Sequence, residues 1–168
     1  MVARVIKSDG GVEQAYVAGL VRVRAAAGAV FCDGSGRVLL VHPVYKDEWE
    51  IPGGTLELGE SPMAACVREV KEELGLCVRV GSLLCVDWVP PRPAWDGGLM
   101  FVFDGGMLSP AQIESIRLDP AELDQIAFVG PSDLASVLVP RLARRVAAGL
   151  ATAAGAVYLE DGADVRDG

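Results

Sequence analysis

The sequence lacks several features that would each indicate a class of protein. No apolar run reaches the roughly 20 residues that a membrane helix needs, and the N-terminal residues lack the apolar core of a signal peptide. There is one histidine, and the four cysteines contain no CxxC pair, which argues against a zinc site or a disulfide framework. We therefore expect a cytoplasmic protein with reduced, mostly buried thiols and no membrane partner.

Positive charge is also scarce. The chain has 15 Lys and Arg against 23 Asp and Glu, which gives a formal net charge of −8. A protein that binds the nucleic-acid backbone needs a basic surface, so this balance argues against general nucleic-acid binding. An anionic phosphate compound must instead be attracted locally, by a metal ion and a few Arg or Lys side chains.

What is present suits one folded domain of 168 residues, 51% of them hydrophobic. Residues 1–17 are expected to form a lead or an edge strand, 18–155 the domain, and 156–168 a flexible acidic tail. Alternating apolar patterns predict strands over 18–33, 37–43, 78–89, 99–104, 113–118 and 125–129. Helices are expected over 131–138 and 140–154. This order predicts a mixed sheet covered by helices, an α/β or α+β layered fold.

The best-defined expected element is a helix over residues 62–74. Ser61 is a favourable N-cap, Pro62 suits the first helical position, and Gly75 suits a left-handed C-terminal residue. At 100° per residue, an apolar arc is predicted from Met63, Val67, Val70 and Leu74.

The opposite arc of this helix carries three carboxylates: Glu69, Glu72 and Glu73. Like charges at such spacing repel by roughly 0.2–0.5 kcal/mol per pair in an isolated helix. A hard divalent cation such as Mg²⁺ takes oxygen ligands and would relieve that repulsion. Taken alone, the same charges are also compatible with an ordinary solvated helix face.

The surrounding residues decide between these interpretations. Gly54, five residues, Glu60, seven residues and then the run REVKEELGL (68–76) match every specified position of the Nudix box. The preceding residues WEIPGG (49–54) also resemble the segment that leads into that box. The chain therefore resembles the Nudix hydrolases over roughly residues 18–150. The resemblance implies a Nudix-type α/β/α sandwich with a mixed β-sheet, in which the box forms a loop, helix and loop beside the sheet.

The resemblance also implies a set of site residues. Glu69, Glu72 and Glu73 would bind Mg²⁺, for which Mn²⁺ can substitute, together with the backbone carbonyl of Gly54. Arg68 would orient these carboxylates through salt bridges, a role that suits its guanidinium fork.

The general base is left open by the sequence. Glu73 and Glu72 are candidates inside the box, and Glu122 in the run ELDQIAFV is the candidate outside it, with a solvated loop glutamate as the alternative. Glu60 is either a structural anchor at the helix N-terminus or a residue of the substrate site.

The reaction implied is Mg²⁺-dependent hydrolysis of a nucleoside diphosphate linked to another group, a small-molecule nucleotide. Pro91 lies fifteen residues after Leu76, which resembles a position found in ADP-ribose pyrophosphatases. ADP-ribose or another nucleoside diphosphate sugar is therefore the first expectation for the substrate. The alternatives are a nucleoside triphosphate, oxidised ones included, and a domain that senses a nucleotide without cleaving it.

Three residues are candidate substrate contacts outside the box. Trp95 and Arg92 belong to a loop bounded by proline and glycine, and Tyr45 to the polar loop before the box. An aromatic ring could stack on a base, although Tyr45 is equally compatible with the core or rim, and Arg92 with the surface. The apolar stripe of the 140–154 helix fits either the chain's own sheet or a second subunit, which leaves a homodimer open.

Overall fold

The architecture is that of a computed structural model, which describes residues 16–93, 95–151 and 155–165. Its strands are β1 (Arg24–Cys32), β2 (Val38–Pro43), β3 (Gly53–Thr55), β4 (Leu83–Val89), β5 (Gly98–Met107), β6 (Leu123–Val129), β7 (Val157–Glu160) and β8 (Ala163–Asp164). Its helices are α2 (Pro62–Leu74), α3 (Pro110–Glu114), α4 (Leu134–Val137) and α5 (Pro140–Ala151). The expectation for residues 1–17 lies almost wholly outside the described residues.

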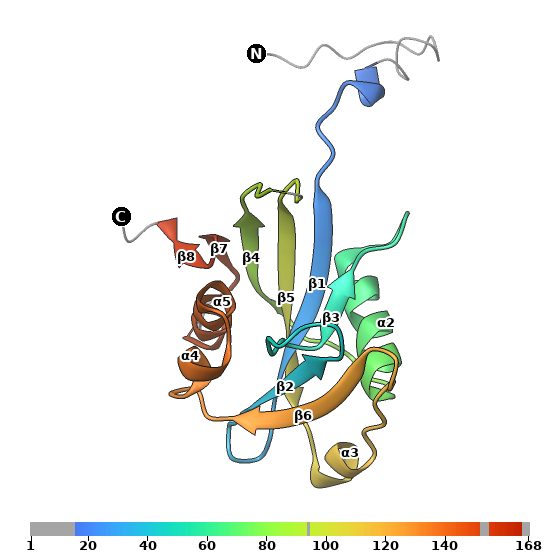
Figure 1. The fold of residues 1–168 in the computed structure, drawn as a ribbon, viewed down its shortest axis with the longest axis vertical. Helices are drawn as coiled ribbons and strands as arrows, with labels where there is room; N and C mark the ends of the chain where they lie inside the picture. Colours follow the sequence, from blue (N-terminus) through green and yellow to red (C-terminus); the bar gives the residue numbers. More distant parts are fainter. Residues whose placement is uncertain (1–15, 94, 152–154, 166–168) are drawn as a thin grey trace.

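The strands form one mixed sheet in the order β6-β2-β1-β5-β4-β7-β8, with β3 paired to β1 off this path (Figure 1). The pairs β1–β5 and β4–β7 are parallel, and the other pairs are antiparallel. The mixed sheet predicted from the sequence is thus confirmed.

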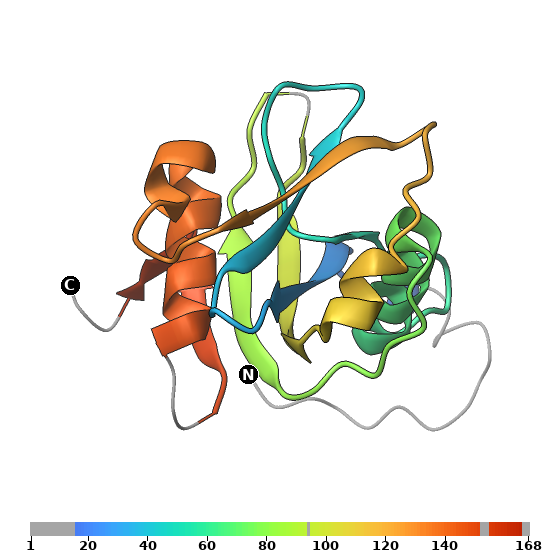
Figure 2. The same ribbon diagram turned by 90° about the horizontal axis from the view of Figure 1, so that it is seen from below.

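Helices cover both faces of this sheet (Figure 2). On one face α2 packs over a core that includes Phe31, Leu39 and Leu74. On the other face α4 and α5 pack over a second core that includes Val102 and Val146. The structure therefore has three layers, and Leu142 and Val146 of the apolar stripe of α5 are buried on the chain's own sheet, whereas Leu150 is exposed.

Backbones approach unusually closely where β3 pairs with β1. A Cβ atom on Gly28 would lie 2.7 Å from the carbonyl oxygen of Pro52, and Gly53 has a φ of 144° that other residues rarely adopt. Any side chain at Gly53 would also lie 2.4 Å from the Cα of Gly28. These glycines let the segment that enters α2 lie directly against the central strand.

The strand expected over 18–33 begins only at Arg24, and the helix expected over 131–138 spans only Leu134–Val137. Three further expectations differ more from the structure. Residues 113–118 were expected as a strand, but Ser109 and Gln112 form a capping box that starts the short helix α3 instead. The strand expected over 78–89 begins only at Leu83. Val78 and Val80 still pack on the core, but they do not belong to a strand.

The expected flexible tail is the third difference. Residues 157–164 form β7 and β8, because β7 pairs in parallel with β4 and so continues the sheet. In the part of the chain that the structure describes, no helix is long and apolar enough to cross a membrane.

Asp33 stabilises the turn between β1 and β2, and its charge gives a testable pH dependence. Its Oδ1 accepts the N–H groups of Ser35 and Arg37, both at 2.9 Å, and its Oδ2 accepts the Nε of Arg37 at 2.8 Å. Desolvation alone would raise the pKa of Asp33, but these donors outweigh it and lower the pKa. A lowered pKa means that the folded state is favoured while the carboxylate is charged, and this advantage is lost as the pH falls through the folded-state pKa.

We expect Asp33→Asn to lower the melting temperature at pH 7, and the difference from the parent to shrink as the pH falls below about 4. Thermal unfolding followed by circular dichroism across this range measures it. Asp47→Asn, at an exposed site, is the control and should show no such pH-dependent difference. A gap between Asp33→Asn and the parent that stays constant down to about pH 3 would contradict this role of Asp33.

Candidate active site

The helix that carries the carboxylates has the bounds predicted from the sequence. Ser61 accepts the N–H of Ala64 at 3.2 Å, Pro62 occupies the first turn, and Gly75 ends the helix with a φ of 68°. Local capping therefore fixes where α2 begins and ends.

The buried face of α2 differs from the predicted arc. Its buried residues are Ala65, Cys66, Val70, Glu73 and Leu74. Met63 is instead 47% exposed. The small side chains of Ala65 and Cys66 allow close packing on the sheet, which rotates the helix and brings Glu73 inward. The predicted apolar arc was wrong at Met63 for this reason.

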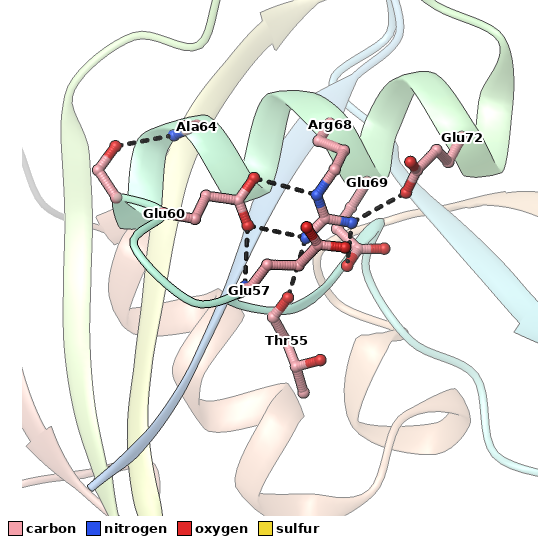
Figure 3. Close-up of polar contacts among 8 residues, drawn as sticks. Thr55, Glu57, Glu60, Ala64, Arg68, Glu69 and Glu72 are labelled. Carbon is pink, nitrogen blue, oxygen red and sulfur yellow. Dashed lines mark hydrogen bonds and ion pairs between the residues drawn. The ribbon is translucent and has the colours of Figure 1, made fainter. Parts of the chain in front are cut away.

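Arg68 organises the carboxylates around it (Figure 3). Its Nη1 donates to Glu69 Oε1 and to Glu72 Oε2, both at 2.9 Å. Its Nε and Nη2 donate to the two carboxylate oxygens of Glu60, at 3.0 and 2.9 Å, and Nη2 also reaches the carbonyl of Thr55 at 3.0 Å. One guanidinium thus ties the helix to the loop that precedes it.

The contacts of Glu60 are those of a structural anchor between α2 and the loop before it. Besides Arg68, its Oε2 accepts the backbone N–H of Glu57 at 3.0 Å. Hydrogen bonds from Arg68 and Glu57 lower the pKa of Glu60 and keep it charged. Its side chain does not line the large cavity beside β1 and β5.

This cavity of about 860 Å³ lies over the N-terminal halves of β1 and β5. One wall comes from β3 and from three carboxylates, Glu69, Glu73 and Glu122. The lining also includes the first turns of α5, with Val139, Leu142 and two arginines. Its volume is at the upper end of the range for small-molecule sites.

Glu73 is the most perturbed of these acids. It is 8% exposed, and its Oε2 accepts the N–H of Gly53 at 2.9 Å. Burial raises the pKa of Glu73 to about 8 against the lowering effect of that N–H, and the nearby charges of Glu69 and Glu122 raise it further. Burial likewise raises the pKa of Glu69, with Arg68 opposing the shift. Glu69 and Glu73 are thus the partly desolvated acids of this cavity, whereas Glu122 is exposed at its edge.

The donor set suits a hard divalent cation. Among residues 16–93, 95–151 and 155–165, no three His, Cys, Asp or Glu side chains surround one point as a preformed metal cage. Glu69 and Glu73 nevertheless line the same cavity as Gly54, and a Cβ atom on Gly54 would lie 2.4 Å from the Glu69 carboxylate. Only glycine at this position leaves room for the Glu69 carboxylate beside the backbone. Glu72 turns to Arg68 and does not line the cavity.

The expected substrate contacts divide into two groups. Tyr45 and Trp95 both line the cavity, and the guanidinium of Arg24 lies 5.3 Å from the centre of the Trp95 ring. Arg92 does not line the cavity but forms an ion pair with Asp161 at 2.6 Å.

Sequence reasoning missed the basic wall of the cavity. Arg141 and Arg145 line it, although the helical stripe of Leu142 and Val146 placed these arginines away from the core. Arg145 is only 4% exposed, because it forms an ion pair with buried Asp87. Nothing in the sequence marks this partnership, which joins residues 58 positions apart.

Comparison with known families identifies the fold. A family profile described as NUDIX domain matches residues 22–150. The chain belongs to the NUDIX family. A MutT NUDIX hydrolase from Burkholderia pseudomallei superposes with a TM-score of 0.63 at 24% identity, covering 79% of this chain and 100% of that one. An ADP-ribose pyrophosphatase from Streptococcus suis gives a TM-score of 0.61 at 19% identity, covering 82% of this chain and 99% of that one.

Curated relatives match over the box and its surroundings. An RNA pyrophosphohydrolase from Psychrobacter cryohalolentis is 38% identical over 71 residues, which is 41% of each chain. Diphosphoinositol polyphosphate phosphohydrolase 2 from Mus musculus is 44% identical over 62 residues, 36% of this chain and 35% of that one. The matches thus span about two fifths of the length of these relatives or less, and the relatives are named for different substrates.

The Arg68 network gives a test of the site that does not depend on turnover. Arg68→Lys keeps the charge but loses the fork that holds Glu60 and Glu69 together. Residues that orient metal ligands typically change metal affinity by about 10–100-fold when altered, so we expect Mg²⁺ to bind at least about tenfold more weakly. Calorimetric titration with Mg²⁺ measures this, and Lys71→Arg on the exposed side of the same helix should bind Mg²⁺ as the parent does. Unchanged Mg²⁺ affinity in Arg68→Lys would show that Arg68 does not orient metal ligands.

Proposed function

We propose that the protein is a Mg²⁺-dependent hydrolase that cleaves the pyrophosphate of a nucleoside diphosphate linked to another group. One observation carries the proposal: Glu69, Glu73 and Glu122 line one cavity beside an intact Nudix box. Glu69, Glu73 and the carbonyl of Gly54 would hold the metal. A bound Mg²⁺ ion supplies charge neutralisation at the phosphates and lowers the pKa of water.

The chain's own residues supply orientation and a proton acceptor. Arg68 holds Glu69 in place and opposes the rise in its pKa that burial causes. The Gly53 N–H occupies one oxygen of Glu73, so Oε1 is the oxygen left for the metal or for a proton. Burial raises the pKa of Glu73, and a cation at the cavity would lower it. Glu122 lines the same cavity and is the alternative acceptor.

Substrate recognition would rest on Trp95, whose exposed ring lines the cavity and offers a face for a base. The expectation of ADP-ribose used Pro91 and Arg92 in the same loop, and the Arg92–Asp161 pair removes Arg92 from direct contact. ADP-ribose and other nucleoside diphosphate sugars therefore remain the proposed class on the strength of Pro91 and Trp95. Nucleoside triphosphates remain the alternative, since some relatives are named MutT or RNA pyrophosphohydrolase.

Replacing Glu73 is the most direct test of the reaction. Glu73→Gln keeps the shape and the acceptor for Gly53 but removes a charge and the proton acceptor. We expect kcat to fall by at least about 100-fold, the usual contribution of a general base, with circular dichroism unchanged. The assay compares ADP-ribose, other nucleoside diphosphate sugars and dNTPs, each with Mg²⁺ and with chelator.

Glu57→Gln, exposed and outside the cavity, is the matched control and should keep parental kcat. Glu73→Gln with parental Mg²⁺-dependent activity would overturn the mechanism. Nucleotide binding by the parent without turnover of any compound would instead favour the sensor.

Glu122 has a separate test. If it serves the reaction, Glu122→Gln should lower kcat by roughly tenfold or more with little change in melting temperature, because its loop position carries no core packing. Steady-state kinetics with the best substrate of the panel decide this. Kinetic constants equal to those of the parent would make Glu122 a solvated loop residue.

A further inference from the structure

The turn between β7 and β8 is bound to both β4 and α5. Asp161 in this turn donates its backbone N–H to the carbonyl of Trp88 at 2.9 Å, and its own carbonyl accepts Nη2 of Arg144 at 2.8 Å. The next residue, Gly162, donates its N–H to the buried carboxylate of Asp87 at 3.0 Å. Figure 1 shows β7 and β8 beside the C-terminal end of β4. The backbone of Asp161 is therefore held from two elements of the fold.

The side chain of Asp161 binds the loop between β4 and β5. Its Oδ1 accepts Nη2 of Arg92 at 2.6 Å, and the two residues are 69 positions apart in sequence. A partly exposed ion pair often contributes little, because two side chains lose conformational freedom when they pair. Here the backbone of Asp161 is already fixed, which reduces that cost. The turn thus offers Arg92 a carboxylate in a defined place.

The contact reaches the cavity through Trp95. The backbone N–H of Arg92 donates to the carbonyl of Trp95 at 2.8 Å, and the N–H of Trp95 donates to the carbonyl of Arg92 at 2.9 Å. Trp95 lines the cavity, its ring is 44% exposed, and the guanidinium of Arg24 lies 5.3 Å from the ring centre. The residue whose side chain binds Asp161 is therefore the residue whose backbone holds Trp95.

We propose that Asp161 is a positioning residue for the substrate, which holds Arg92 and so keeps the Trp95 ring where a base can stack on it. The turn between β7 and β8 lies beyond residues 22–150, the range of the family match, and gains a part in substrate affinity. The inference rests on the proposed contact between Trp95 and a base, and it does not depend on cleavage.

The test breaks the contact from both ends. Asp161→Asn removes the charge but keeps the shape, and asparagine, like aspartate, adopts the φ of 50° found at this position more readily than most residues. Arg92→Gln removes the same contact from the loop side, and Arg92→Lys keeps the positive charge. Glu160→Gln, which neutralises an exposed carboxylate of the same hairpin outside the cavity, is the matched control.

Calorimetry with Mg²⁺ compares ADP with inorganic pyrophosphate, because only ADP has a base. We expect Trp95→Ala to weaken ADP by about tenfold or more, as the loss of one stacked base should. Asp161→Asn and Arg92→Gln should each weaken ADP by roughly threefold to fivefold, a part of that loss, and leave pyrophosphate unaffected. Arg92→Lys should restore part of the affinity, and Glu160→Gln should match the parent.

A double variant separates positioning from a general structural effect. In the Trp95→Ala background, Asp161→Asn should cause no further loss of ADP affinity, because the ring that it positions is gone. The proposal would be overturned by equal weakening of ADP and pyrophosphate, by a loss that persists in full without Trp95, or by parental ADP affinity in both Asp161→Asn and Arg92→Gln.

The placement of the ring can also be measured without a ligand. Fluorotryptophan incorporated at the three tryptophans gives three fluorine NMR resonances, each assigned by a Trp→Phe variant. We expect Asp161→Asn and Arg92→Gln to shift or narrow the Trp95 resonance and to leave that of Trp49 unchanged. A Trp95 resonance identical to that of the parent in both variants would contradict the proposed role of Asp161.

Turnover separates this proposal from the proposed function. If the parent cleaves no compound but ADP affinity falls as expected, the hydrolase proposal fails and the role of Asp161 stands. If the parent is active, Asp161→Asn should raise KM for the nucleotide and leave kcat within about twofold, because the carboxylates near α2 are untouched. Cleavage with parental KM and parental ADP affinity in Asp161→Asn would refute only the role of Asp161.

Discussion

The site depends on the close backbone contact between β1 and β3. Two carboxylates, Glu69 and Glu73, are withdrawn from solvent beside this contact. Gly28 and Gly53 allow the contact, and Gly54 leaves room for Glu69 against the chain. Burying a charged group is costly unless it is paired. Arg68 compensates Glu60, Glu69 and Glu72, whereas Glu73 has a single N–H donor that does not offset its burial, so burial raises its pKa. A divalent cation at the cavity would complete the compensation, which is why the local packing and the proposed chemistry belong together.

A second buried ion pair supports the far side of the cavity. Asp87 on β4 pairs with Arg145 on α5 and also accepts the N–H of Gly162. Breaking such a pair leaves an uncompensated buried charge, so it fixes α5 to the sheet strongly. The turn that it holds lies beyond residues 22–150, the range of the family match. A segment outside the range of the family match therefore packs on the helix that lines the cavity.

The distance in sequence between two interacting residues determines whether the structure they form could be predicted. The bounds of α2 were predicted because Ser61, Pro62 and Gly75 act on their immediate neighbours. The capping box of Ser109 and Gln112 is equally local, but the spacing of the apolar residues after it suggested a strand. Strand β7 was missed because its partner β4 lies about 70 residues away in sequence.

The candidate site also contains residues that the sequence indicated and residues that it did not. Glu69 and Glu73 were singled out from the sequence, since they form one motif within a single helix, whereas Glu122 outside the motif was left open between a site residue and a solvated loop residue. The basic wall was not predicted, because periodicity assigns Arg145 to the surface and Asp87 is brought to it only by the fold. Arg92 was a candidate substrate contact, with the surface as the alternative, and no pattern in the sequence marks Asp161 as its partner.

The carboxylates on the α2 side of the cavity are the proposed metal site, and Mn²⁺ gives a direct measurement of it. Crystals soaked in Mn²⁺ should show one or more anomalous peaks inside the cavity, within about 2.0–2.4 Å of oxygens of Glu69 and Glu73, with the Gly54 carbonyl among the ligands. Saturating Mn²⁺ that leaves this wall of the cavity without an anomalous peak would contradict the assignment.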